Sequence, residues 1–204
     1  EFAQATASPS HLFKFHMSEG GLRVPLIISG PGIKKGKNHN FAFVTDIAAT
    51  LSDIVFDNVD ERIIGKSLQN SLAGTEEKNY LDTDSVGLEV TGNSALFKGD
   101  FKIVKNRPPN GSNQWELFNL AEDPGETVNL AKSMPNKLLE LIGEYEAYAE
   151  ENGVIELPLD YEWAAEMTIN TFKRNYLPLI WKAAFFIILA LSLAVILVRR
   201  CRNS

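Results

Sequence analysis

An apolar block near the C-terminus limits the ways in which this chain can fold. Residues 177–198 are apolar apart from Ser192 and Lys182, and about 22 residues of helix span roughly 33 Å, slightly more than a bilayer's hydrocarbon core. Lys182 lies near one end, where its ammonium can reach the lipid headgroups, and Trp181 suits the membrane interface. The block has no polar face, so the sequence predicts a transmembrane helix; the alternative is a buried core helix ending a soluble domain.

The flanks of this block predict its orientation and the domain limits. We expect a soluble domain over residues 1–157, a juxtamembrane linker over 158–176, the transmembrane helix over 177–198 and a basic tail over 199–204. The tail carries three arginines, which favour a cytoplasmic C-terminus although basic residues also precede the span. The soluble part would then be extracytoplasmic, periplasmic or extracellular, with membrane lipid as a partner of the helix.

Composition excludes several classes of function. The net charge is −6 and the pI near 5.2, so we expect no nucleic-acid partner. Cys201 is the only cysteine, which excludes an intrachain disulfide and a cysteine zinc site; it is an idle thiol or a palmitoylation site beside the membrane. The first ten residues lack the features of a signal peptide, and we expect them to be internal to a longer protein.

The soluble part predicts mixed α and β structure. The pair Gly20-Gly21 permits a sharp turn or a close backbone approach, and residues 26–28 after it predict a buried strand. Residues 41–56 predict a strand or loop followed by a helix, which Thr45 can cap, with Ile47, Thr50, Leu51 and Ile54 facing the core.

The second half of the soluble part predicts a hairpin followed by a helix. Residues 101–104 and 115–118 are typical of strands, and the turn signal at 108–112 lies between them. Pro135 suits a first helical position, Gly153 suits a helix end, and an apolar stripe lies between them. The stripe comprises Leu138, Leu139, Leu141, Ile142, Tyr145, Tyr148 and Ala149.

Five segments, in order along residues 1 to about 153, resemble the sulfatase family of the alkaline-phosphatase superfamily. Residues 19–25, Glu-Gly-Gly-Leu-Arg-Val-Pro, look like the family's E-G-G-x-R-V-P, and residues 2–14 are similar to the stretch before it in bacterial arylsulfatases. Residues 45–51 resemble D-I-x-P-T-L, with Ala49 where proline is usual. Residues 95–102 resemble R-A-x-R-x-G-D-W-K, and residues 115–130 resemble W-E-L-Y-D-L followed by D-P-x-E-x-x-N-L.

The resemblance implies the fold and the chemistry. The implied fold is α/β: the C-terminal part of an alkaline-phosphatase-like sulfatase domain, ending in a small antiparallel sheet with a packed helix. The implied reaction is hydrolysis of a sulfate ester by a formylglycine, with a calcium ion polarising the sulfate. The formylglycine motif, C/S-x-P/A-x-R, does not occur in this chain, and the resemblance places the calcium ligands upstream. We therefore expect no metal ligand here, and no activity from this piece alone.

The resemblance also implies the site residues. Lys14 lies five positions before Glu19, where the family has a lysine that contacts the sulfate, and its ammonium would neutralise oxygens that gain charge as the S–O bond breaks. Glu19 and Arg23 are expected to brace the turn, through a Glu–Arg contact that holds Lys14 in place. The three histidines, His11, His16 and His39, are expected in surface or packing roles.

Two alternatives stay open at this point. The first is a phosphonate or phosphate ester hydrolase of the same superfamily, since the tetrahedral anions are alike. The second is a non-catalytic membrane-anchored interaction module.

Overall fold

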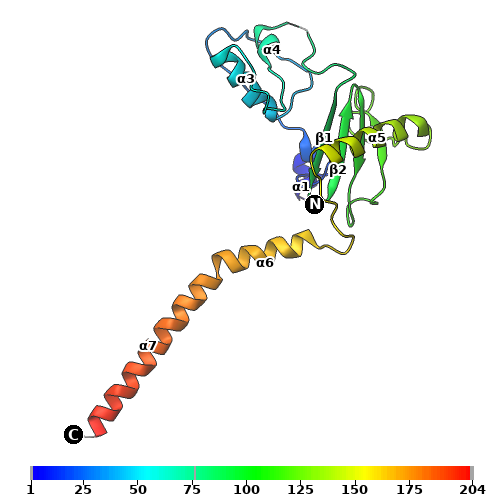
Figure 1. The fold of residues 1–204 in the computed structure, drawn as a ribbon. Coiled ribbons are helices and arrows are strands. Elements are labelled where there is room, and N and C mark those ends of the chain that lie inside the picture. The colour runs from blue at the N-terminus through cyan, green and yellow to red at the C-terminus, as the bar shows by residue number, and fades with distance from the viewer. Residues whose placement is uncertain (1, 76, 203–204) are drawn as a thin grey trace. The chain divides into compact units, whose positions relative to one another are not determined.

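The computed structural model describes residues 2–75 and 77–202 (Figure 1). These residues divide into two compact units, Glu1–Glu156 and Leu157–Ser204. The elements of the first unit are α1 (Phe2–Ala7), α2 (Glu19–Leu22), α3 (Thr45–Phe56), α4 (Gln69–Ala73), β1 (Ser85–Val90), β2 (Asn93–Lys98), β3 (Phe101–Lys105), β4 (Glu116–Asn119) and α5 (Pro135–Glu151). The second unit contains α6 (Trp163–Asn175) and α7 (Leu177–Arg202).

The four strands form one antiparallel sheet in the order β1-β2-β3-β4. The predicted hairpin is confirmed as β3 and β4, with Val104 opposite Glu116. The hairpin of β1 and β2 was not predicted. Its turn is Thr91-Gly92, and both residues have positive φ, 53° and 79°, as a two-residue hairpin turn of the primed type requires.

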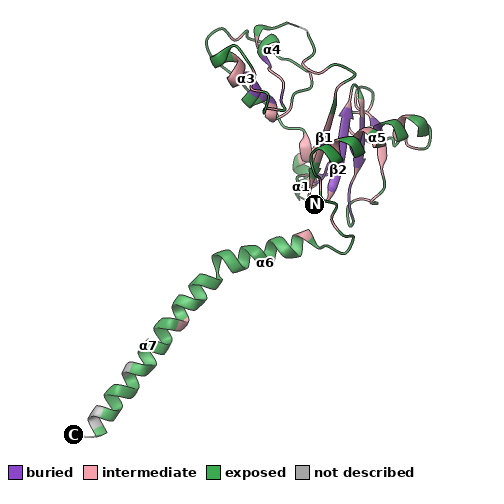
Figure 2. Ribbon diagram, viewed as in Figure 1, coloured by how far each residue is buried: buried purple, intermediate pink, exposed green. Residues whose placement is uncertain are grey.

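The central strands are buried on both faces, which Figure 2 shows in the colour of buried residues. One face packs under α5, where Leu96, Ile103 and Leu117 meet Leu141 and Tyr145. The other face has its own core of Met17, Ala95, Val104 and Phe118. The segment before α2 therefore covers the side of the sheet opposite to α5.

Helix α5 forms as the sequence predicts. Pro135 is its first residue, and Gly153, with φ 63°, follows the C-cap Asn152. The predicted apolar stripe packs on the sheet, except for Leu139, whose side chain is 66% exposed. Tyr145 also donates a hydrogen bond to the Ser94 hydroxyl at 2.9 Å.

Helix α3 lies within the segment that was predicted to contain a helix, but most of its apolar side chains face outward rather than inward. Thr50 is buried as expected, whereas Ile47, Leu51 and Ile54 are exposed. Thr45 is the first helical residue rather than a side-chain cap, and Val44 occupies the cap position. The side of the helix that carries Asp46 and Thr50 faces inward because these two residues make buried hydrogen bonds.

The buried bonds of α3 hold it to the chain that follows. The Asp46 carboxylate accepts bonds from the Phe43 amide at 2.6 Å, the Lys66 amide at 2.8 Å and the Tyr80 hydroxyl at 2.5 Å. The Thr50 hydroxyl accepts a bond from the Leu68 amide at 2.9 Å. Burial, and then the contact with Asp46, raise the pKa of Tyr80 above its ordinary value. A buried acid needs such partners, and they fix which face turns inward.

The prediction of a buried strand at residues 26–28 is wrong. Leu26, Ile27 and Ile28 are 49%, 90% and 37% exposed and form no strand. The apolar run has the composition of a buried strand, but no described strand pairs with it. A strand needs a neighbour to satisfy its backbone groups, and composition alone cannot supply one.

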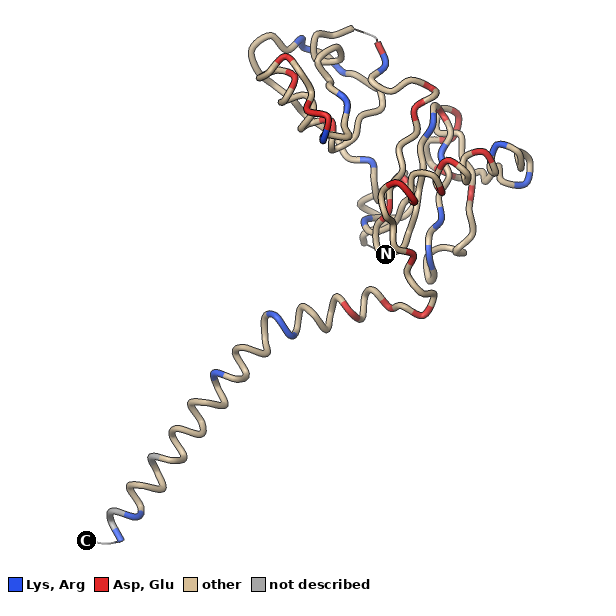
Figure 3. The backbone as a smooth tube through the Cα atoms, in the orientation of Figure 1, with Lys and Arg blue, Asp and Glu red and all other residues tan. Residues whose placement is uncertain are grey.

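From Trp163 onward the described part of the second unit consists of two helices, with Tyr176 between them. Helix α6 occupies most of the stretch expected to be a linker, and α7 contains the predicted span. One helical stretch among the described residues, Trp163–Arg199, is long and apolar enough to cross a membrane by length and composition. Figure 3 shows α7 almost free of charge along its middle. Its large described apolar side chains are exposed.

Candidate functional site

The glycine pair of α2 lies directly against the loop that carries Lys14. The Gly20 amide donates a bond to the His11 carbonyl oxygen at 2.8 Å. A Cβ at Gly20 would lie 2.1 Å from the Leu12 carbonyl oxygen, and one at Gly21 would lie 2.1 Å from that of His16. The predicted close backbone approach is confirmed, and it fixes residues 11–16, the Lys14 loop, on top of α2.

The backbone on both sides of Lys14 is strained. Leu12 and Phe15 have φ values of 58° and 77°, a region that bulky residues rarely adopt. The Phe15 carbonyl oxygen accepts bonds from the Asn93 amide group at 2.6 Å and the Thr91 hydroxyl at 3.3 Å. Strain of this kind persists only where surrounding structure enforces it, and the β1–β2 turn does so here.

Lys14 itself is exposed. Its ammonium lies 5.1 Å from the centroid of the Phe15 ring, and it takes part in none of the ion pairs among the described residues. A lysine with no carboxylate partner keeps its charge available to an anion. The Lys14 loop therefore combines a fixed backbone with an ammonium that has no ion-pair partner among the described residues.

The chain after Lys14 is tied to the sheet by side-chain amides. The Met17 amide donates to the Asn106 side-chain oxygen at 2.8 Å, and the Asn106 nitrogen donates to the Ser18 hydroxyl at 3.0 Å. His16 is buried, with Nδ1 3.1 Å from the Phe13 carbonyl oxygen and Nε2 3.1 Å from the Asn110 side-chain nitrogen. Both ring nitrogens are therefore engaged inside the unit, which gives His16 a packing role.

Glu19 belongs to a buried ionic cluster that the sequence did not reveal. The Lys102 ammonium lies 2.9 Å from a Glu19 carboxylate oxygen and 2.7 Å from one of Glu126. The second Glu126 oxygen accepts the Glu19 backbone amide at 2.8 Å. The Lys102 side chain is 0% exposed, and its ammonium also lies 4.8 Å from the centroid of the Phe97 ring. We call Lys102, Glu19 and Glu126 the buried triad; it locks α2 to β3.

The contact predicted between Glu19 and Arg23 differs from the contacts that these two residues make in the structure. Among the described residues the ionic partner of Glu19 is Lys102, and Arg23 touches Glu19 through its backbone amide, which donates to the Glu19 carbonyl oxygen at 2.8 Å. The Arg23 side chain is exposed. The alternation of β3 offered a signal for Lys102, because Lys102 and Val104 share a strand face and Val104 is apolar.

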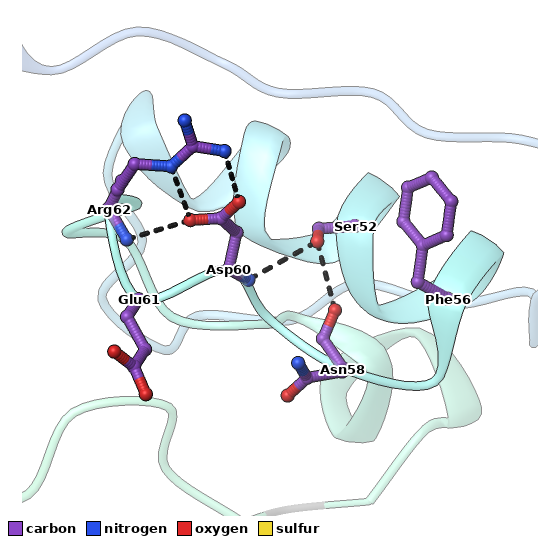
Figure 4. Close-up of a pocket in the computed structure, with 6 residues that line it drawn as sticks. All are labelled: Ser52, Phe56, Asn58, Asp60, Glu61 and Arg62. Carbon is purple, nitrogen blue, oxygen red and sulfur yellow. Dashed lines mark hydrogen bonds and ion pairs between the residues drawn. The ribbon is translucent and has the colours of Figure 1, made fainter.

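A separate surface pocket lies at the end of α3, and Figure 4 shows its lining. Arg62 makes two bonds to the Asp60 carboxylate, at 2.9 Å and 2.6 Å, and holds the pKa of that acid down to about 2. The Ser52 hydroxyl donates to the Asn58 carbonyl oxygen at 2.9 Å. Asp60 and Arg62 are paired with each other, and Lys14, Glu19 and Arg23 are not among the residues that line this pocket.

The described side chains do not gather into a metal site: among them, no group of three or more His, Cys, Asp or Glu is placed to hold a metal ion. The acidic residues of the buried triad are already paired with Lys102. The described residues thus do not form a calcium site of their own.

The chain is similar in sequence to sulfatases. No protein-family model matches it. An uncharacterized sulfatase of Schizosaccharomyces pombe is 32% identical over 181 residues, covering 78% of this chain and 31% of the relative. Arylsulfatase K of Xenopus laevis is 26% identical over 140 residues, covering 63% and 26%.

The structural comparison agrees on the fold. A Bacteroides thetaiotaomicron structure, from work on the metabolism of multiple glycosaminoglycans, matches with a TM-score of 0.56 at 22% identity. The match covers 66% of this chain and 31% of that one. The chain spans about a third or less of the length of these two relatives and of the protein in this structure. The chain is therefore classed with the sulfatases, as a C-terminal portion of the sulfatase fold.

Proposed function

We propose that this chain is the C-terminal part of a membrane-anchored, arylsulfatase-like sulfuric ester hydrolase. The N-terminal part, corresponding to the remaining two thirds or so of the relatives, supplies the formylglycine nucleophile and the calcium ligands. The present residues bind and orient the anionic group and anchor the enzyme. The substrate class is a sulfate ester, in keeping with the names of the relatives.

The observation that carries the proposal is the setting of Lys14. Its ammonium is exposed and unpaired among the described residues, yet its backbone is held by the glycine pair and the β1–β2 turn. A preorganised cation that needs no rearrangement stabilises charge where it develops in the transition state. In this chain Lys14 contacts the sulfate oxygens.

Glu19 and Arg23 have supporting roles in this proposal. Glu19, fixed by Lys102 and Glu126, holds the start of α2 and therefore the loop that packs on it. Arg23 follows α2 as its C-cap, where its backbone amide closes the turn and its side chain is exposed.

The anchor sets the location of the enzyme. Helix α7 spans the membrane, the first unit is extracytoplasmic and the C-terminal tail is cytoplasmic. The support is the apolar, charge-poor middle of α7 and the arginines near its C-terminal end.

The proposal is tested with a joined protein, in which the first two thirds of the Schizosaccharomyces pombe relative precede this full chain. The joined protein in lipid nanodiscs is expected to hydrolyse 4-nitrophenyl sulfate faster than 4-nitrophenyl phosphate or a phosphonate ester. Lys14→Ala is expected to lower kcat about 100-fold or more, because it removes a preorganised charge from the transition state. The matched control is Lys132→Ala, another exposed lysine of the same unit.

Three results would contradict the proposal. Faster turnover of the phosphate or phosphonate ester favours the sister activity of the superfamily. The absence of any turnover by the folded joined protein favours a non-catalytic anchored module. Equal kcat values for Lys14→Ala and Lys132→Ala remove Lys14 from the site. Hydrogen exchange of the β3 amides shows in each case whether the sheet is folded.

A further inference from the structure

Helix α6 leads directly into the apolar helix α7, as Figure 1 shows. The Tyr176 amide donates a hydrogen bond to the Phe172 carbonyl oxygen at 2.9 Å, and the Ile180 amide donates one to the Tyr176 carbonyl oxygen at 3.0 Å. Helical backbone bonding therefore continues across Tyr176, the C-cap of α6. The side of the helix on which a residue of α6 lies can consequently be followed into α7.

One narrow side of α6 is apolar along the helix and its C-cap. At 100° a residue, Ala165, Ile169, Phe172 and Tyr176 lie within an arc of roughly 60°, and we call these four residues the α6 stripe. Ile169, Phe172 and Tyr176 are 44%, 50% and 55% exposed. The rings of Phe172 and Tyr176 are stacked, with their centroids 5.7 Å apart. The stripe is thus an apolar surface that the described residues leave open.

The other sides of α6 are mainly polar. Lys173 and Arg174 lie in the last turn, next to α7, and Glu166 lies in the first turn. Trp163 and Met167 are apolar residues away from the stripe, and tryptophan is enriched at membrane interfaces. A helix with an apolar stripe, low overall hydrophobicity and basic residues outside the stripe is typical of helices that lie in the membrane surface, where lysine and arginine meet anionic headgroups.

Pro178 determines the direction in which the helix bends between α6 and α7. It has no backbone N–H, and its ring crowds the carbonyl group of Arg174, four residues earlier, so the helix bends away from the side of the proline. Around the helix axis, Pro178 lies about 150° from the middle of the α6 stripe. The stripe is therefore on the inner side of the bend, which is the side that faces a bilayer crossed by α7.

We propose that α6 lies in the headgroup region of the membrane that α7 crosses, with the α6 stripe toward the acyl chains and the polar sides toward water. This inference rests on the proposed function, because it requires α7 to span the membrane. Lipid is the occupant because the stripe continues along the same side of α7 through Leu179, Ala183 and Ile187, which belong to the span. An upright α6 would instead leave the stripe in water over about 20 Å of helix.

The test reports the surroundings of two neighbouring positions on α6. Phe172→Cys in the stripe and Thr171→Cys on a polar side, both exposed, are made in the Cys201→Ser background of the full chain and labelled with the fluorophore NBD. The labelled chains are reconstituted in nanodiscs of phosphatidylcholine and phosphatidylglycerol. We expect quenching by iodide to be about threefold or more weaker at position 172 than at position 171. Quenching by a phosphatidylcholine that carries a doxyl group near its headgroup is expected to be about threefold or more stronger at position 172.

A substitution within the stripe tests what holds the helix in lipid. Ile169→Gln is expected to increase iodide quenching at position 172 about twofold or more, because it removes apolar area that lipid covers. The matched control is Asn170→Gln on a polar side, which is expected to leave the quenching unchanged. Equal quenching at position 172 in these two variants overturns the proposal.

Three other results also overturn it. Strong and equal iodide quenching at positions 171 and 172 indicates a helix that stands upright in water. Weak and equal quenching at both positions indicates that α6 continues the span inside the bilayer. Weak iodide quenching at position 172 without quenching by the doxyl lipid indicates that protein, such as a second copy of this chain, covers the stripe.

A label in α7 separates this inference from the proposed function. The label on Phe185→Cys is expected to be shielded from iodide, because position 185 lies within the predicted span. If position 185 is shielded and α6 gives one of the contrary results, the inference fails and the anchor stands. If position 185 is open to iodide, the anchor of the proposed function fails, and the inference fails with it. Turnover of 4-nitrophenyl sulfate by the joined protein tests the enzymatic function separately.

Discussion

Removing the cation of the buried triad is expected to be the most damaging single substitution in the first unit. In Lys102→Met, the side chain keeps its length and apolar stem, but Glu19 and Glu126 remain beneath the surface, 6% and 5% exposed, without their shared ammonium. Breaking a buried pair by removing one partner costs about 3–5 kcal/mol, chiefly because it leaves an uncompensated charge. We expect a loss of that size in the free energy of unfolding.

The loss is measured by native-state hydrogen exchange of the β3 amides in the full chain, because core-strand amides report the global opening of their unit. A change of 3–5 kcal/mol accelerates exchange by about two to four powers of ten. The control is Lys132→Met, an exposed lysine, with an expected change of less than about 0.5 kcal/mol. In Lys102→Met with Glu19→Gln and Glu126→Gln, most of the loss is expected to disappear, because no charge stays buried. A loss below about 1 kcal/mol in the single variant, or no recovery in the triple variant, would refute this reasoning.

Three further predictions test other parts of the structure. Gly21→Ala places a Cβ 2.1 Å from a backbone oxygen and is expected to destabilise the unit by about 1–3 kcal/mol. Gly143→Ala places its Cβ in open space on α5 and is expected to stabilise the unit by about 0.5–1 kcal/mol. Urea unfolding of both variants checks that the two changes in unfolding free energy have opposite signs. The Lys66 ammonium lies 2.5 Å from the Asp84 carboxylate and lowers the pKa of that carboxyl. This ion pair therefore stabilises the folded state at pH values above the ordinary Asp pKa, and the stabilisation is lost as the pH falls through the lowered pKa of Asp84. NMR titration of Lys66→Met is expected to give Asp84 a higher pKa, and an unchanged pKa would contradict that cause. Leu189→Arg is expected to make membrane insertion of α7 less favourable by about 2.5–3.5 kcal/mol, as measured by the fraction of chains recovered in microsomal membranes, and equal recovery would argue against a span.

Where local patterns decide structure, the sequence was a sufficient guide. Pro135 and Gly153 bound α5 as their backbone preferences predict, and the β3–β4 hairpin follows from two apolar runs around a proline-rich turn. The hairpin of β1 and β2 was accessible in the same way, because Thr91-Gly92 separates two short runs, but threonine is a weak signal for positive φ.

The sequence was misleading where the burial of a side chain depends on contacts with residues that are distant in the sequence. The rule that apolar residues face inward gave the wrong face of α3, because the inward face there is chosen by the bonds of Asp46 and Thr50. Lys102 was overlooked because a lysine in a strand normally points to water, and only the three-dimensional approach of Glu19 and Glu126 makes its burial tolerable. The place of Lys14 on a clamped loop follows from the glycine pair, whereas the strain at Phe15 depends on the distant Asn93.

The three residues of the buried triad are far apart in the sequence, and this separation determines the order in which the chain can fold during its synthesis. Glu19 contacts Lys102 across 83 residues and Glu126 across 107. A ribosome synthesising this chain must therefore extend it past position 126 before the segment around Lys14 can acquire its final fixed shape. Until then that segment stays a substrate for chaperones and proteases, and truncations just upstream of Glu126 should leave it unprotected even though every residue of the loop has been made.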